Sequence, residues 1–183
     1  MPKRPNEMDL DDLEGRRMKL YAALEGEDDL GVVLRAHIHI EHELKEFALV
    51  SAPNPEELKF SHFDYDSVVA LALALGLNPA LKGALSAIGN LRNKFAHNLD
   101  RALSEQDGNN VYNALSPDMK TDAQDGYNNF RKRPKYADLP KSMMKLPPKR
   151  LFGICVVQVH MAILVQILHV YERVLEGGHG KKA

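Results

Sequence analysis

A nearly continuous apolar run near the C-terminus constrains the fold more than any other part of the chain. Residues 151–171 read LFGICVVQVHMAILVQILHVY, about the length of a helix that spans a bilayer. Polar side chains recur through this run, and polar groups that face lipid are costly; they are Gln158, His160, Gln166 and His169. The run therefore predicts a long final helix that is buried in the protein or in a dimer interface, and no membrane span.

The composition is that of a soluble globular protein. The chain has 183 residues, of which 44% are hydrophobic and 27% are charged. Lys and Arg number 24 and Asp and Glu 25, so any site that attracts nucleic acid must be a local one. The single cysteine, Cys155, excludes a disulfide framework within the chain, and the N-terminus shows no signal-peptide pattern. We therefore expect a cytoplasmic protein with one main domain.

Helical periodicity dominates the chain, and no segment alternates long enough to predict a strand. The pattern predicts helices over residues 11–24, 30–50, 67–75 and 79 to about 99, and a final helix over about 148–176. Asp29 is a candidate N-cap for the second helix, and Asp64 or Asp66 for the third. The fold class is thus all-α, with a long C-terminal helix.

The chain divides into three parts by composition. Residues 1–29 hold the first helix and an acidic turn, residues 30–176 form the helical domain, and residues 177–183 are predicted to be a disordered tail. A polar and basic connection occupies about 100–150, with room for a short helix from Ser116-Pro117. Its basic, proline-rich part, residues 131–150, suits either an arm that contacts RNA or DNA or a solvated linker.

The candidate chemistry lies in residues 91–97, LRNKFAH, where Arg92 and Asn93 precede His97. Arginine can clamp a phosphate with two parallel hydrogen bonds, and histidine can move a proton near neutral pH. Residues five apart on an ideal helix point about 140° apart, so Arg92 and His97 do not share a face, whereas Asn93 and His97 do. Either the helix loosens near His97, or a second copy completes the site across a two-fold axis.

A carboxylate on the second helix is a candidate partner for this arginine. Glu41 interrupts the apolar stripe of that helix, with His37 one turn before it. Arg92 falls on the apolar stripe of its own helix. Because a buried charge without a partner is expensive, we expect a buried ion pair in which Glu41 holds Arg92 from behind.

The motif resembles the R-N-x-x-x-H signature of the HEPN superfamily, helical proteins that include many metal-independent ribonucleases. The segments IEHEL (40–44), ALALGL (72–77) and LSAIGNLRNKFAH (85–97) are similar to the mannitol operon repressor family, a HEPN-like branch. The resemblance covers about residues 30–99 and implies a HEPN-like antiparallel helical bundle.

The resemblance also implies a function. In catalytic HEPN proteins the Arg and the His carry RNA cleavage, so Arg92, Asn93 and His97 are the candidate catalytic residues, with Glu41 behind them. It implies a homodimeric endoribonuclease that needs no metal or cofactor, in a toxin–antitoxin or phage-defence role with a cognate antitoxin. The alternative is a non-catalytic regulator like the mannitol operon repressor, which acts through protein partners.

Two other readings of the sequence compete with catalysis. The motif can be structural, with Arg92 buried against Glu41 and His97 placed at the helix end, where its charge favours the dipole. The stretch HIHIEHE (37–43) invites a metal site, but its useful pairs, four residues apart, have no second cluster to complete them. We expect His160 and His169 to be interior or interface histidines.

Overall fold

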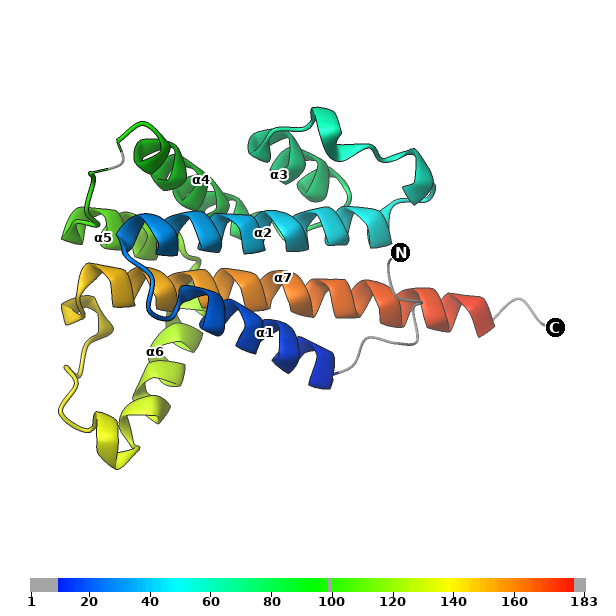
Figure 1. The fold of residues 1–183 in the computed structure, drawn as a ribbon. Helices are drawn as coiled ribbons and strands as arrows, with labels where there is room; N and C mark the ends of the chain where they lie inside the picture. Colours follow the sequence, from blue (N-terminus) through cyan, green and yellow to red (C-terminus); the bar gives the residue numbers. More distant parts are fainter. Residues whose placement is uncertain (1–9, 99, 180–183) are drawn as a thin grey trace.

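The computed structural model describes residues 10–98 and 100–179, and this part of the chain contains helices and no strand (Figure 1). It is 79% helical, which confirms the all-α prediction. The α-helices are α1 (Leu10–Leu24), α2 (Asp29–Ser51), α3 (Tyr65–Ala74), α4 (Lys82–Ala96), α5 (Glu105–Ala114), α6 (Pro117–Arg131) and α7 (Pro148–His179). Short 3-10 turns lie between them, at Pro55–Glu57, Phe60–His62, Pro79–Leu81, Pro134–Tyr136 and Met143–Lys145.

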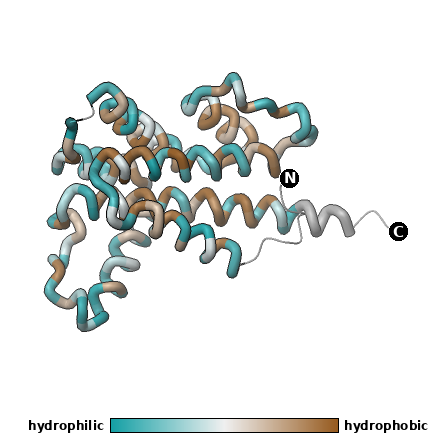
Figure 2. The backbone as a smooth tube through the Cα atoms, viewed as in Figure 1, coloured by the Kyte–Doolittle hydropathy of each residue, from teal (hydrophilic) through white to brown (hydrophobic). Residues whose placement is uncertain are grey.

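The two longest helices, α2 and α7, form the centre of the bundle and run in the same direction (Figure 1). α1 runs back along them in the opposite direction, α3 and α4 cover α2, and α5 and α6 pack on α7. Figure 2 shows hydrophobic residues along both central helices. Burial of these facing stripes is the main stabilising term for such a bundle.

The final helix is buried as its apolar run predicts. Within α7, Leu151, Phe152, Val159, Ile163 and Ile167 are almost fully excluded from solvent. By length and composition alone, Pro148–Arg173 is also apolar enough to cross a membrane, and 56% of its most apolar window is buried inside the protein. The cover comes mainly from α1, α2 and α5.

Side-chain caps fix where the helices that build the site begin. Asp28, one residue before the predicted cap, accepts a hydrogen bond from the Gly31 backbone N–H and starts α2. Asp64 caps α3 as predicted, by accepting from the backbone N–H of Ser67. After α3 the chain turns at Gly76, whose φ of +104° suits glycine, and a 3-10 turn leads directly into α4.

The predictions for two regions need correction. The connection over 100–129 holds two full helices, α5 and α6, where the sequence suggested one short helix. α5 begins at a capping box in which Ser104 and Asp107 bond each other's backbone N–H groups. α7 continues to His179, past the predicted end at Gly177-Gly178, and the rest of the predicted tail lies outside the described residues.

Candidate functional site

The motif lies in the last turns of α4, and its two apolar residues anchor it. Leu91 and Phe95 are buried in the core, whereas Arg92 is half-buried and Asn93 is exposed. His97 caps the C-terminus of α4, with its ring exposed and its backbone N–H still bonded to the carbonyl oxygen of Asn93. The helix therefore does not loosen before His97, and one copy cannot turn Arg92 and His97 toward the same phosphate.

Arg92 is held by an amide. Its Nη1 donates to Oδ1 of Asn93 over 2.9 Å. Among the residues that the structure describes, Arg92 forms no ion pair with a carboxylate, and none of its unbonded nitrogens is buried. Its guanidinium thus keeps its charge and free N–H groups at the surface, which is what binding of an anion requires.

The expected ion pair between Glu41 and Arg92 is not formed. Oε1 of Glu41 lies 2.6 Å from Nζ of Lys45, one turn further along α2, and Oε2 lies 3.7 Å from Nδ1 of His37. The Glu41 side chain is 23% exposed, so it sits at the edge of the buried face. A lysine four residues on supplies the counter-charge locally, so Glu41 needs no partner from α4.

Beneath Arg92, an aromatic contact joins three helices. His37 on α2 is buried, with its ring 4.3 Å from the ring of Tyr65 on α3. The Tyr65 hydroxyl donates to the carbonyl oxygen of Leu85 on α4 over 3.0 Å. Burial, and then the positive charge of Arg92, lower the pKa of His37 below its ordinary value. His37 therefore stays neutral beside Arg92, and this contact fixes α4 against α2 and α3.

A glycine allows this close approach. A Cβ on Gly89, three residues before Arg92, would lie 2.7 Å from Cε1 of Tyr65. The ring consequently packs directly against the backbone of α4 at Gly89, where a side chain would displace it. Burial raises the pKa of Tyr65 well above its ordinary value, so its hydroxyl stays protonated as a donor.

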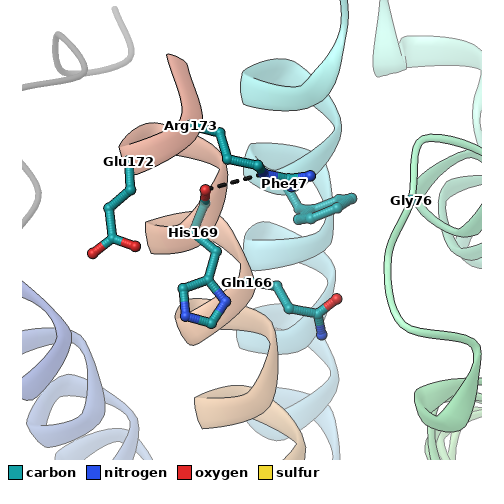
Figure 3. A pocket seen from close by; sticks show the side chains of 6 residues that line it. All are labelled: Phe47, Gly76, Gln166, His169, Glu172 and Arg173. Atoms are coloured by element: carbon teal, nitrogen blue, oxygen red, sulfur yellow. Dashed lines mark hydrogen bonds between the residues drawn. The ribbon is translucent and has the colours of Figure 1, made fainter. Parts of the chain in front are cut away.

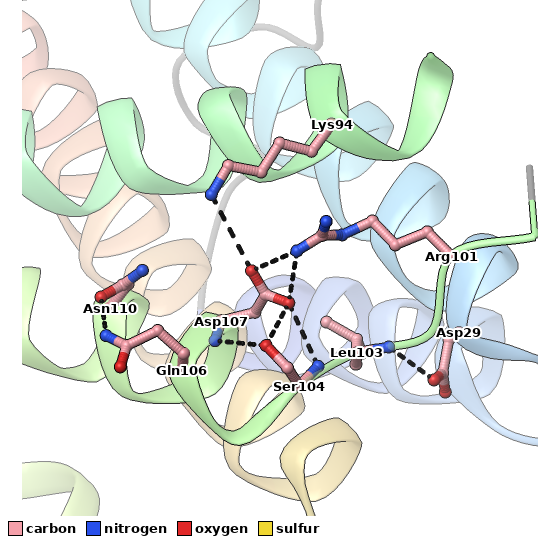
Figure 4. Close-up of polar contacts among 8 residues, drawn as sticks. All are labelled: Asp29, Lys94, Arg101, Leu103, Ser104, Gln106, Asp107 and Asn110. Carbon is pink, nitrogen blue, oxygen red and sulfur yellow. Dashed lines mark hydrogen bonds and ion pairs between the residues drawn. The ribbon is translucent and has the colours of Figure 1, made fainter. Parts of the chain in front are cut away.

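The segment after His97 is tied down by a buried carboxylate (Figure 4). Asp107 accepts two hydrogen bonds from Nη2 of Arg101, at 2.9 and 2.8 Å, and others from the backbone and hydroxyl of Ser104. Burial alone would raise the pKa of Asp107, but the bonds from Ser104 and Arg101 hold it below its ordinary value. Asp29, which does not cap α2, accepts a hydrogen bond from the backbone N–H of Leu103 over 2.8 Å. These contacts fix the chain that leaves the motif.

The sequence analysis missed the most buried ionic cluster of the described residues. Glu43 on α2 is only 3% exposed, and its Oε2 accepts a hydrogen bond of 2.7 Å from Nη1 of Arg16 on α1. Its Oε1 lies 3.4 Å from Nε2 of the fully buried His160 on α7, without the alignment of a hydrogen bond. Burial would raise the pKa of Glu43, but His160 and Arg16 lower it. This cluster joins α1, α2 and α7, whereas the motif lies on α4.

The predictions for the histidines are mixed. His160 is interior, as predicted, but its ring nitrogens have no hydrogen-bond partner among the described residues. His169 is exposed and therefore not interior, so for this residue only a place in an interface stays a prediction. Over the described part of the chain, no group of three or more His, Cys, Asp or Glu side chains is arranged to hold a metal ion.

A surface cleft of about 470 Å³ lies between the ends of α2 and α7 (Figure 3). It is lined by Phe47, Gly76, Gln166, His169, Glu172 and Arg173. Gln166 uses both ends of its amide within the chain, since it accepts from the N–H of Asn78 and donates to the carbonyl of Ala162. No motif residue lines this cleft, so it gives no support to the predicted chemistry.

Comparison with known proteins adds no assignment: no family model, curated protein or solved structure matches the chain. The resemblance to HEPN proteins and to mannitol operon repressors therefore stays a prediction from the quoted residues alone.

Proposed function

We propose that the chain is a metal-independent endoribonuclease whose active site is shared between two copies. In each site, Arg92 and Asn93 of one protomer face His97 of a second protomer. The observation that carries the proposal is the state of Arg92, which Asn93 holds without neutralising its charge. By contrast, Arg16 and Arg101 are paired with carboxylates at 2.7–2.9 Å.

The helix geometry supports a site shared between two copies. α4 stays helical through Ala96, so Arg92 and His97 of one copy diverge by about 140°. Two copies related by a two-fold axis place equivalent surfaces opposite each other, and an axis beside the end of α4 would bring the Arg92 of each copy toward the His97 of the other. The exposed side chains of Asn93 and His97 leave this end of α4 open to a second copy and to substrate.

The reaction is a transesterification within RNA. His97 takes the proton of the 2′-hydroxyl as its oxygen forms a bond to the adjacent phosphorus. The bond from phosphorus to the 5′-oxygen breaks, that oxygen takes a proton from solvent, and His97 returns its proton to solvent. Arg92 donates hydrogen bonds to the phosphorane oxygens as negative charge develops on them. The products are a 2′,3′-cyclic phosphate and a 5′-hydroxyl, with no change of oxidation state.

The test is cleavage of RNA by the purified chain in excess EDTA. We expect wild-type protein to produce 2′,3′-cyclic phosphate ends and His97→Ala to lose this activity with unchanged thermal stability, because the ring is exposed. A strand with 2′-deoxyribose throughout should stay intact. Cleavage that requires a divalent metal, or that persists in His97→Ala, would contradict the proposal.

The alternative is a non-catalytic regulator similar to the mannitol operon repressor. Its support is that a single copy does not bring Arg92 and His97 together, and that neither residue lines the cleft between α2 and α7. Under this alternative the same assay gives intact RNA for every variant, and the exposed motif binds a protein partner.

A further inference from the structure

The segment that follows α6, on the way to α7, is strongly basic. Residues 130–141, here called the basic arm, contain five basic residues and one acidic residue, Asp138, in a chain whose net charge is −1. The basic residues are Arg131, Lys132, Arg133, Lys135 and Lys141. Positive charge is therefore concentrated here, which creates a local field that attracts anions.

These cations are not used to stabilise the fold through ion pairs. Among the described residues none of the five lies within 4.0 Å of a carboxylate oxygen. Arg131 donates to the carbonyl of Leu139 over 2.9 Å, and Lys132 donates to the side-chain oxygen of Asn129 over 2.8 Å, both neutral acceptors. No carboxylate among the described residues therefore neutralises the charge of the arm.

Two aromatic rings stack at the centre of the arm. The ring centres of Phe130 and Tyr136 lie 3.9 Å apart, with an angle of 25° between the ring planes. Cζ of Arg133 lies 5.8 Å from the centre of the Phe130 ring, and Nζ of Lys135 lies 5.5 Å from that of Tyr136. Phe130 is 36% exposed, so this stack is at the surface and outside the core. The arm therefore presents flat groups interleaved with cations.

The arm is held in a defined position. The Tyr127 hydroxyl donates to the carbonyl of Pro140 over 2.7 Å, which ties the returning chain to α6 next to the bond between Arg131 and Leu139. In Figure 1 the arm projects from the bundle, and α4 lies on the other side of α2 and α7. A ligand can thus reach the arm without passing the motif.

We propose that the basic arm binds single-stranded RNA through phosphate contacts and base stacking. Single strands expose base faces that stack on aromatic rings and guanidinium planes, while Lys and Arg contact the backbone. An acidic protein would use the charges but not the paired rings, and a duplex hides its base faces. The inference deepens the proposed function and rests on it for the choice of RNA. Because arm and motif lie apart, binding and cleavage are separable by mutation.

The experiment measures the binding of the full chain to a fluorescent single-stranded oligonucleotide of about 16 nucleotides by anisotropy over a range of salt concentrations. The strand carries 2′-deoxyribose, so it cannot be cleaved through a 2′-hydroxyl, and binding is read whether or not the chain is a nuclease. An RNA strand of the same sequence is measured with the His97→Ala variant. The test variant is Arg133→Gln/Lys135→Gln; the control is Lys19→Gln/Lys59→Gln, with the same charge change at exposed lysines of other elements.

We expect the test variant to bind about tenfold more weakly than wild type, and its slope of log affinity against log salt to fall by about 1.4, or 0.7 for each lost phosphate contact. The control variant should match wild type. Phe130→Leu keeps an apolar side chain but removes the ring, and should weaken binding about tenfold with little change in the salt slope. In the cleavage assay, the arm variants should raise KM with little change in kcat.

Four results would overturn the inference: no binding by wild type, equal loss in the test and control variants, unchanged binding in Phe130→Leu, or equal affinity for a duplex of the same sequence. Tighter retention on vesicles with anionic headgroups than on the single strand would assign the arm to a membrane surface and also overturn it. If wild-type protein does not cleave RNA but binds the single strand through the arm, the proposed nuclease activity is refuted and the inference about the arm stands.

Discussion

Nη1 of Arg92 donates a hydrogen bond to Oδ1 of its neighbour Asn93 over 2.9 Å, so an amide holds this guanidinium in place of a carboxylate. Asn93→Asp keeps the shape of the side chain but adds a negative charge at this contact. We expect it to lower RNA cleavage by about 10²-fold, because a neutralised Arg92 stabilises the phosphorane less. Thermal stability should stay unchanged or rise slightly.

The matched control is Asn90→Asp, the same change one turn earlier on α4, where the exposed Asn90 side chain donates a hydrogen bond to Ser86 and, among the described residues, none to Arg92. Its cleavage rate should stay close to that of wild type. Equal rates for the two variants would show that the charge of Arg92 takes no part in the reaction.

Two adjacent arginines on α1 should differ strongly in their effect on stability. Arg16 pairs with the buried Glu43, whereas Arg17 makes an exposed pair with Glu14. Arg16→Ala strands a buried carboxylate and should lower the free energy of unfolding by about 3 kcal/mol. Arg17→Ala should change it by less than about 0.5 kcal/mol. Urea denaturation measures both, and similar values would mean that Glu43 is not buried in solution.

Gly89 and Gly126 offer a paired test of the contact beneath Arg92. Gly89→Ala brings a Cβ to 2.7 Å from Cε1 of Tyr65, whose ring is held by His37 and by the carbonyl of Leu85. We expect a loss of about 1–3 kcal/mol in the free energy of unfolding. Gly126→Ala, in α6 with nothing within 4 Å of the new Cβ, should stabilise by about 0.5–1 kcal/mol. A neutral or stabilising Gly89→Ala would contradict the packing of α3 on α4.

The lowered pKa of Asp107 predicts how stability depends on acid. A carboxyl group whose pKa is lower in the folded than in the unfolded state stabilises the fold above its unfolded pKa of about 3.9. This contribution is lost as pH falls through the folded pKa. The free energy of unfolding of wild type should therefore decline more steeply below about pH 4 than that of Asp107→Asn. Asp125→Asn, an exposed aspartate on α6, should keep the wild-type slope.

The helices with clear apolar periodicity were predictable from the sequence, as α2, α3, α4 and α7 show, and side-chain caps mark the start of α2 and α3. α5 was not, because Glu105–Ala114 is rich in Asn and Gly, which have low helix propensity. The fold overrides this through the capping box at Ser104 and through close packing on α7. A Cβ on Gly108 would lie 3.3 Å from Cδ2 of Leu151. The packing on α7 depends on a neighbour that the local sequence does not reveal, whereas the capping box, with Ser104 three residues before Asp107, is a local signal that the prediction missed.

Asn93 and His97 are exposed, but the predicted ion pair between Glu41 and Arg92 is absent, and the buried carboxylate of α2 is Glu43. Glu41 and Glu43 lie two residues apart and point about 200° apart around α2, so only one of them can lie on the buried face. Contacts from two distant helices decide it, since Arg16 on α1 and His160 on α7 meet Glu43. Lys45 satisfies Glu41 within α2 itself.

The central claim is that Arg92 of one copy acts with His97 of another, and mixing two inactive variants tests it most directly. Arg92→Ala and His97→Ala should each fail to cleave RNA in EDTA, with folding intact because neither side chain is buried. When the two are mixed and allowed to exchange subunits, each mixed dimer regains one site with both groups, and cleavage should return. Activity in either variant alone, or a mixture that stays inactive although mixed dimers form from an active wild type, would contradict the shared site.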